Sequence, residues 1–175
     1  MKTLISIGLA ICSVATAHAQ TTMTMDDSVA AMSTAGRYII NRYGGDLLLN
    51  PDIRCASVRQ CRVEHASPAV ASSASTRRKL LLEELRRQLH NPRLVTREAA
   101  LGCDDQTRTC RVRGAARFFE INEPTFNGST ATVRIHYYEN DGRFVRQQSD
   151  LLHLSRGAAA DWVIVGRDAY GMHAK

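Results

Sequence analysis

Apolar residues recur at roughly helical spacing near the start of the chain, between residues 26 and 43. Two acidic residues open this segment and Gly44-Gly45 closes it, which is typical of the two ends of a helix. The apolar positions between them are Val29, Met32, Ile39, Ile40 and Tyr43. This pattern predicts an amphipathic helix.

A second helix is predicted over residues 76–90. Leu82, Leu85 and Leu89 form one apolar stripe, and Asn91-Pro92 supplies a stop signal. The preceding stretch, residues 52–75, contains Pro68 and a run of Ser and Ala without a clear period. We therefore expect this stretch to be an irregular loop within one domain.

From residue 94 onward the apolar positions alternate with a period of two, as they do in strands. Asn127-Gly128 and Asn140-Asp141-Gly142 mark two hairpin turns. The candidate strands cover residues 94–101, 111–121, 130–139, 144–154 and 162–170. The sequence thus predicts an α+β fold, with two N-terminal helices packed on a curved antiparallel meander of four to five strands.

The first 19 residues have the features of a secretory signal. Lys2 precedes a short apolar core, and Ala17-His18-Ala19 forms an A-x-A cleavage motif before Gln20. The core is shorter than the ~20 residues of a spanning helix, and a lipoprotein signal at Cys12 would truncate it further. We expect export to the periplasm or the cell exterior, and a single domain over residues 20–175 that is not an integral membrane protein.

The net charge says little about partners. The chain has 23 Lys and Arg against 17 Asp and Glu, a net charge of +6, and loss of Lys2 with the signal leaves +5. The arginines are scattered among acidic residues, whereas nucleic-acid surfaces gather cations together with stacking aromatics. We therefore expect no nucleic-acid partner, and a small hydrophobic ligand or a periplasmic protein in its place.

Four cysteines follow the signal, Cys55, Cys61, Cys103 and Cys110. An even number in an exported chain predicts disulfides, with three connectivities open. The short spacings favour two local bridges, Cys55–Cys61 and Cys103–Cys110. The spacings do not match the tight pairs of zinc sites or redox motifs, and the histidines lack metal-ligand spacing. We expect structural bridges, no metal and no cofactor.

The last strands resemble a known superfamily. The residues that carry the resemblance are ATVRIHYY at 131–138, Asp141-Gly142, LLHLSR at 151–156 and WVIVG at 162–166. This string is similar to the sheet of the nuclear transport factor 2-like superfamily, which includes the SnoaL-like and ketosteroid-isomerase-like proteins. The resemblance covers about a third of the chain and implies a ligand between the helices and a curved sheet. No catalytic motif transfers residue by residue.

The chemical candidates lie on the predicted meander. His136, His153 and Asp150 are candidates for catalysis, because a histidine beside a carboxylate provides a general base and its orienting group. If the sheet curves over a cavity, three further residues are candidates for ligand contacts: Arg134, Tyr138 and Asp168. The alternative is that each is a polar residue on a solvated sheet face, with local hydrogen bonds.

These patterns favour a small exported, disulfide-stabilised binding or accessory protein over an enzyme. The sequence has no nucleophile elbow, no phosphate-binding loop and no dinucleotide fingerprint. Two alternatives stay open. One is a pocket enzyme of isomerase or hydratase type that uses His136 or His153 with Asp150, and the other is a periplasmic inhibitor that presents a cysteine-closed loop to its target.

Overall fold

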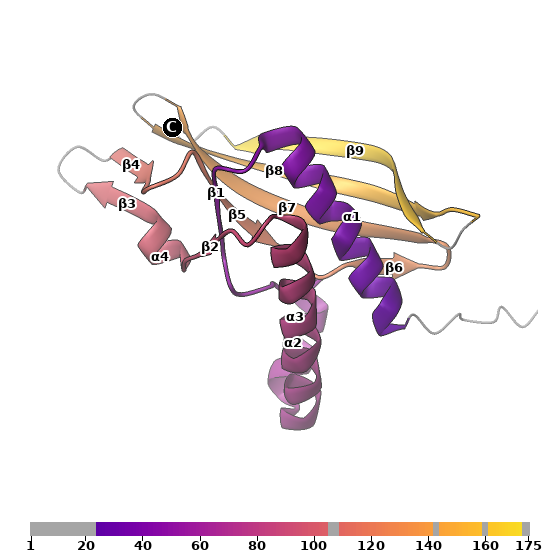
Figure 1. Cartoon of the computed structure of the whole chain (residues 1–175). Coiled ribbons are helices and arrows are strands. Elements are labelled where there is room, and N and C mark those ends of the chain that lie inside the picture. The colour runs from indigo at the N-terminus through magenta and orange to yellow at the C-terminus, as the bar shows by residue number, and fades with distance from the viewer. Residues whose placement is uncertain (1–23, 105–108, 142–143, 159–160, 173–175) are drawn as a thin grey trace, which may run out of the picture.

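A computed structural model describes residues 24–104, 109–141, 144–158 and 161–172 (Figure 1). The expected signal segment, residues 1–19, and Gly142 of the second predicted turn lie outside these residues. The described helices are α1 (Met25–Tyr43), α2 (Val58–Ala66), α3 (Pro68–Gln88) and α4 (Arg97–Ala100). The described strands are β1 (Leu47–Leu49), β2 (Arg93–Leu94), β3 (Leu101–Asp104), β4 (Thr109–Val112), β5 (Arg117–Ile121), β6 (Thr125–Asn127), β7 (Thr130–Asp141), β8 (Phe144–Arg156) and β9 (Trp162–Met172).

Seven strands form one mixed sheet in the order β2-β1-β5-β7-β8-β9, with β6 paired to β7. β1 runs parallel to both β2 and β5, and the other pairs of this sheet are antiparallel. β3 and β4 form a separate two-stranded hairpin. Figure 1 shows α1 lying across the sheet, α2 and α3 extending beyond it, and the β3–β4 hairpin standing to one side.

The predicted architecture of two helices on a meander of four to five strands is wrong. The described residues form four helices and nine strands, seven of them in a mixed sheet. Residues 52–75 contain α2 and the first turns of α3 in place of an irregular loop. Pro68 is the first residue of α3, where a proline costs no hydrogen bond. β1 was missed because all three of its leucines are buried, so the segment has no alternation.

The main core lies between α1, α3 and one face of the sheet, which we call the inner face. Gly36 allows the two helices to approach closely, because a Cβ atom there would lie 2.7 Å from the Cβ of Gln88. α1 begins with a capping box between Thr24 and Asp27 and ends at Gly44, whose φ is 78°. The core residues of the helices and long strands include Met32, Ile39, Leu81, Leu85, Val133, Ile135, Leu152 and Leu154.

A smaller apolar cluster covers one end of the opposite face, which we call the outer face. Phe118 and Tyr138 of the sheet pack there against Leu48, Ala100 and Val112. α4 and the β3–β4 hairpin supply the last two of these residues. The rest of the outer face on β7 and β8 carries half-buried or exposed side chains.

Both predicted disulfides are confirmed. Cys55–Cys61 joins the segment before α2 to α2 itself, with the two Cα atoms 5.5 Å apart. Cys103–Cys110 joins directly paired residues of β3 and β4. Across the described ranges, no helix has the length and apolar character needed to cross a membrane.

We expect Leu85→Ala to lower the free energy of unfolding by roughly 2–5 kcal/mol, because Leu85 is fully buried between α1 and the sheet. Leu80→Ala, on the same helix at a side chain that is 42% exposed, is the matched control and should cost about 0.5 kcal/mol. Urea unfolding monitored by circular dichroism measures both. Equal losses for the two variants would contradict the assigned helix face.

Candidate functional site

A groove of about 620 Å³ lies between α1 and the first residues of β9. The α1 side chains that line it are three or four residues apart and so share one face of the helix. The lining residues are Thr34, Arg37, Tyr38, Asn41, Arg42, Trp162, Val163 and Ile164. Thr34 also joins the two walls, because its hydroxyl donates a hydrogen bond to the carbonyl of Trp162 at 2.9 Å.

The groove combines an apolar wall with two cations. On the β9 side, Ile164 pairs with Leu154, points to the inner face and is 38% exposed. The neighbouring Val163 pairs with Ser155, so its side chain points to the outer face. On the α1 side, Arg37 donates to the hydroxyls of Ser33 and Thr34, and Arg42 donates to the hydroxyl of Tyr43. Neither guanidinium pairs with a carboxylate of the described residues. The groove therefore presents exposed apolar surface beside positive charge that the protein itself does not neutralise.

Asp150 lies behind this groove, fully buried on the inner face. The hydroxyls of Tyr38 and Tyr43 each donate a 2.7 Å hydrogen bond to its Oδ2 atom, and the Nη2 atom of Arg167 lies 2.9 Å from its Oδ1 atom. These contacts join α1 to β8 and β9. They also place two hydroxyl donors and one cation against a carboxylate that would otherwise be costly to bury.

The hydrogen bonds of Asp150 determine the charge state of this cluster. Burial acts to raise the pKa of Asp150, but the hydrogen bonds from Arg167, Tyr43 and Tyr38 outweigh it and hold the pKa below its ordinary value. Burial and the bond to Asp150 raise the pKa of Tyr38 to about 12. At neutral pH the cluster is thus an ionised carboxylate held by protonated donors, and it contains no free base.

The structure does not bring His136 or His153 to Asp150. Asp150 pairs with Ile135, whereas His136 pairs with the neighbouring Ser149, so Asp150 and His136 point to opposite faces. His153 also lies on the outer face, where its Nε2 atom is 2.8 Å from the Oδ2 atom of Asp168. Both members of that pair are exposed to solvent. The histidine–carboxylate pair that forms on β8 and β9 is therefore His153 with Asp168.

Three of the predicted residues, Arg134, His136 and Tyr138, lie on the outer face of β7 beside the buried Glu120. The Tyr138 hydroxyl donates to Oε2 of Glu120 at 3.2 Å. Burial, and then the charge of Glu120, raise the pKa of Tyr138 to about 12. Burial lowers the pKa of His136, and nearby arginines lower it further. Glu120 was not among the predicted residues, and the signal that could have revealed it is a carboxylate within the apolar run Phe-Phe-Glu-Ile.

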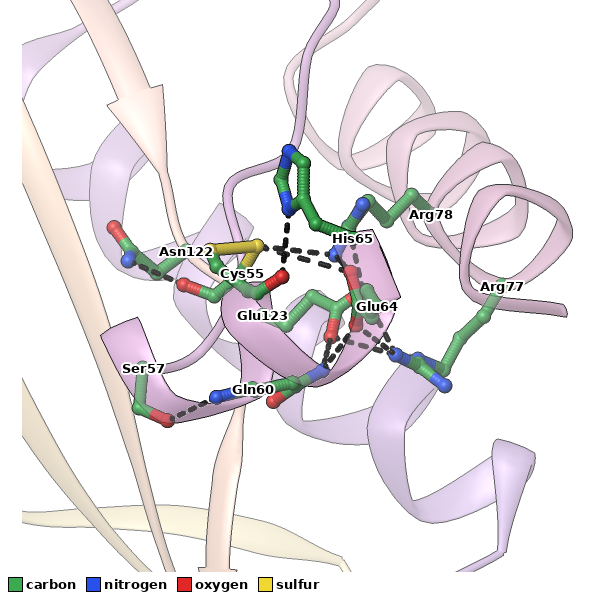
Figure 2. A network of polar contacts seen from close by, with 10 residues as sticks. Cys55, Ser57, Gln60, Glu64, His65, Arg77, Arg78, Asn122 and Glu123 are labelled. Carbon is green, nitrogen blue, oxygen red and sulfur yellow. Dashed lines mark hydrogen bonds and ion pairs between the residues drawn. A yellow bond between two sulfur atoms is a disulfide. The ribbon is translucent and has the colours of Figure 1, made fainter. Parts of the chain in front are cut away.

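A second buried polar network fixes α2 and α3 to the sheet (Figure 2). Glu64 of α2 and Glu123, which follows β5, are both buried and face Arg77 and Arg78 of α3. The Nε2 atom of Gln60 donates to both carboxylates, at 2.9 Å to Glu64 and 2.6 Å to Glu123. The donors of Gln60, Arg77 and Arg78 are paired with the carboxylates of Glu64 and Glu123, so the role of the network is structural. We call it the clamp.

Comparison of the chain with protein-family models, with curated proteins and with solved structures finds no match. Function is therefore argued from the geometry of the chain itself. Within the described ranges, no group of three or more His, Cys, Asp or Glu side chains is placed to hold a metal ion. The groove between α1 and β9 is the candidate site that combines a hollow with unneutralised charge.

We expect Asp150→Asn to lower the free energy of unfolding by roughly 3–5 kcal/mol at pH 7, because the change leaves Arg167 without its anionic partner. Since the folded-state pKa of Asp150 is depressed, its contribution is present above about pH 4 and is lost as the pH falls further. The difference between wild type and variant should therefore shrink toward pH 3. Urea unfolding at a series of pH values measures this.

The matched control is Asp168→Asn, which removes the exposed partner of His153. An exposed pair contributes little, so this variant should lose less than about 1 kcal/mol. A loss for Asp150→Asn no larger than that of the control, or one that is unchanged at pH 3, would show that Asp150 is not the ionised centre of the cluster.

Proposed function

We propose that the chain is an exported binding protein that holds a small anionic amphiphile in the groove between α1 and β9. The observation that carries this proposal is the exposed apolar side chain of Ile164 in a groove that also holds two arginines without carboxylate partners. An apolar ligand body would cover the β9 wall, and a carboxylate, sulfate or phosphate group would accept hydrogen bonds from the guanidinium groups of Arg37 and Arg42.

Binding fits this groove better than proton transfer does. Tyr38 lines the groove, but its hydroxyl proton is engaged by Asp150 and its pKa is raised to about 12. Asp150 accepts from three donors and is fully buried. His136 and His153 lie on the other face of the sheet. A general base would need to be free and within reach of the ligand, and the groove offers none.

Export and the superfamily resemblance belong to the same proposal. Disulfides persist in oxidising compartments, and both bridges of this chain join segments that are close in sequence. Cleavage after Ala19 would remove Cys12 and leave the four bridged cysteines. A relationship to the nuclear transport factor 2-like superfamily would place the ligand between helices and sheet, the same general position as the α1–β9 groove.

The groove is tested with 8-anilinonaphthalene-1-sulfonate, an anionic apolar fluorophore. Trp162 is the single tryptophan of the chain and lines the groove, so its emission reports occupancy directly. We expect saturable binding that quenches Trp162, and at least roughly tenfold weaker binding in the double variant Arg37→Gln, Arg42→Gln.

The control for this experiment is the double variant Arg59→Gln, Arg62→Gln, which removes the same charge from two exposed arginines of α2. It should bind the fluorophore as the wild type does. Equal weakening in both double variants would mean that net charge alone attracts the probe, and probe binding without quenching of Trp162 would place it elsewhere; either result rejects the groove.

Export is tested by expressing the full chain with its own first residues in a Gram-negative host. The periplasmic protein should begin at Gln20 and should react with a thiol reagent only after reduction, at four cysteines. Intact mass spectrometry measures both properties. Retention of Met1, or labelling before reduction, would contradict export with two bridges.

A further inference from the structure

We propose that the outer face of the sheet carries a second site, which binds a small oxyanion of the phosphate or sulfate type. Arg54, Arg97 and Arg134 would hold the anion, with His136 beside it and Glu120 beneath the arginines. This site lies on the opposite side of the sheet from the α1–β9 groove, and its argument does not depend on that groove.

Four segments that are distant in sequence converge at this place. Arg54 follows β1, Arg97 is the first residue of α4, Glu120 lies on β5, and Arg134 and His136 lie on β7. The pairing of β5 with β7 puts Glu120 directly opposite His136. Arg134 and His136 are two residues apart on one strand and therefore point to the same face.

Glu120 orients two of the arginines. Its side chain is 3% exposed, and its Oε2 atom lies 3.4 Å from Nη1 of Arg54 and 3.9 Å from Nη1 of Arg97. Asn50 and Tyr138 also donate to this carboxylate. The guanidinium of Arg97 lies over the Tyr138 ring at 5.1 Å from its centre, which fixes its plane. The buried carboxylate of Glu120 thus contacts one nitrogen atom of each of these two guanidinium groups.

The remaining donors of these arginines face solvent. The side chains of Arg54 and Arg97 are 45% and 43% exposed although each approaches Glu120. A guanidinium has five N–H donors, so contact with one carboxylate oxygen leaves most of them free. Arg134 is exposed, and its guanidinium makes no hydrogen bond or ion pair with another described residue. The site therefore contains three guanidinium groups and one carboxylate. The resulting excess of two positive charges suits a dianion.

His136 reports on the occupancy of the site. It is half-buried, and its imidazole makes no hydrogen bond with another described residue. Burial, followed by the charges of Arg54, Arg134 and Arg97, lowers its pKa, while Glu120 acts to raise it. A dianion among the arginines would neutralise their charge and so raise the pKa of His136.

The test follows the imidazole signals of the full chain by NMR during pH titrations, with and without inorganic phosphate at constant ionic strength in chloride. The His136 signal is assigned by its loss in His136→Asn. We expect phosphate to raise the pKa of His136. A second arm with glycerol 3-phosphate distinguishes a site open to phosphate esters from one that takes only the free ion.

Three variants that each remove one positive charge complete the test. Arg134→Gln removes an arginine without an internal partner, so folding should be preserved, and it should weaken phosphate binding at least roughly tenfold. Arg59→Gln on α2 should change nothing. Arg97→Gln is a second variant of the site, with the same expected loss. A shift of His136 that is the same in Arg134→Gln and Arg59→Gln, or that chloride alone reproduces, would mean an adventitious ion only and would overturn the proposal.

Discussion

The long antiparallel pairing of β7 with β8 determines on which side of the sheet each functional group lies. Ile135 and Asp150 pair on the inner face, and the adjacent pair, His136 and Ser149, points outward. A slip of β8 by one residue would turn Asp150 away from Tyr38 and would bring Ser149 and His153 to the inner face. The inner groove and the outer basic cluster are thus two consequences of one register.

Buried carboxylates engage several of the arginines of this chain. Asp150 pairs with Arg167, while Glu64 and Glu123 share Arg77 and Arg78. Arg78 contacts both glutamates at once, which a planar group with several donors can do and an ammonium group does poorly. These arginines hold the fold, whereas guanidinium donors that are not engaged by a carboxylate are the ones available for binding.

Periodicity predicted the parts of the fold that have one buried face. α1 was predictable because its apolar stripe and its end signals agree, and the bridges followed from cysteine spacing. α2 could not be predicted from periodicity, because its one buried residue is Glu64. The β7 residues of the outer face could be grouped by alternation, with His136 among them. Their partner Arg54 arrives from a distant segment, and no local pattern reveals such a tertiary contact.

The clamp between α2, α3 and Glu123 affects the order in which parts of the molecule unfold. Between residues 58 and 73 Glu64 is the one described residue that is buried, so this arm has almost no apolar core of its own. Its attachment depends on ion pairs, hydrogen bonds and the Cys55–Cys61 bridge. Hydrogen bonds from Gln60 and Arg78 keep the pKa of Glu64 low against the effect of burial, so acid removes this attachment. We therefore expect this arm to open before the sheet does and to expose its backbone to hydrogen exchange and proteases while the rest stays folded.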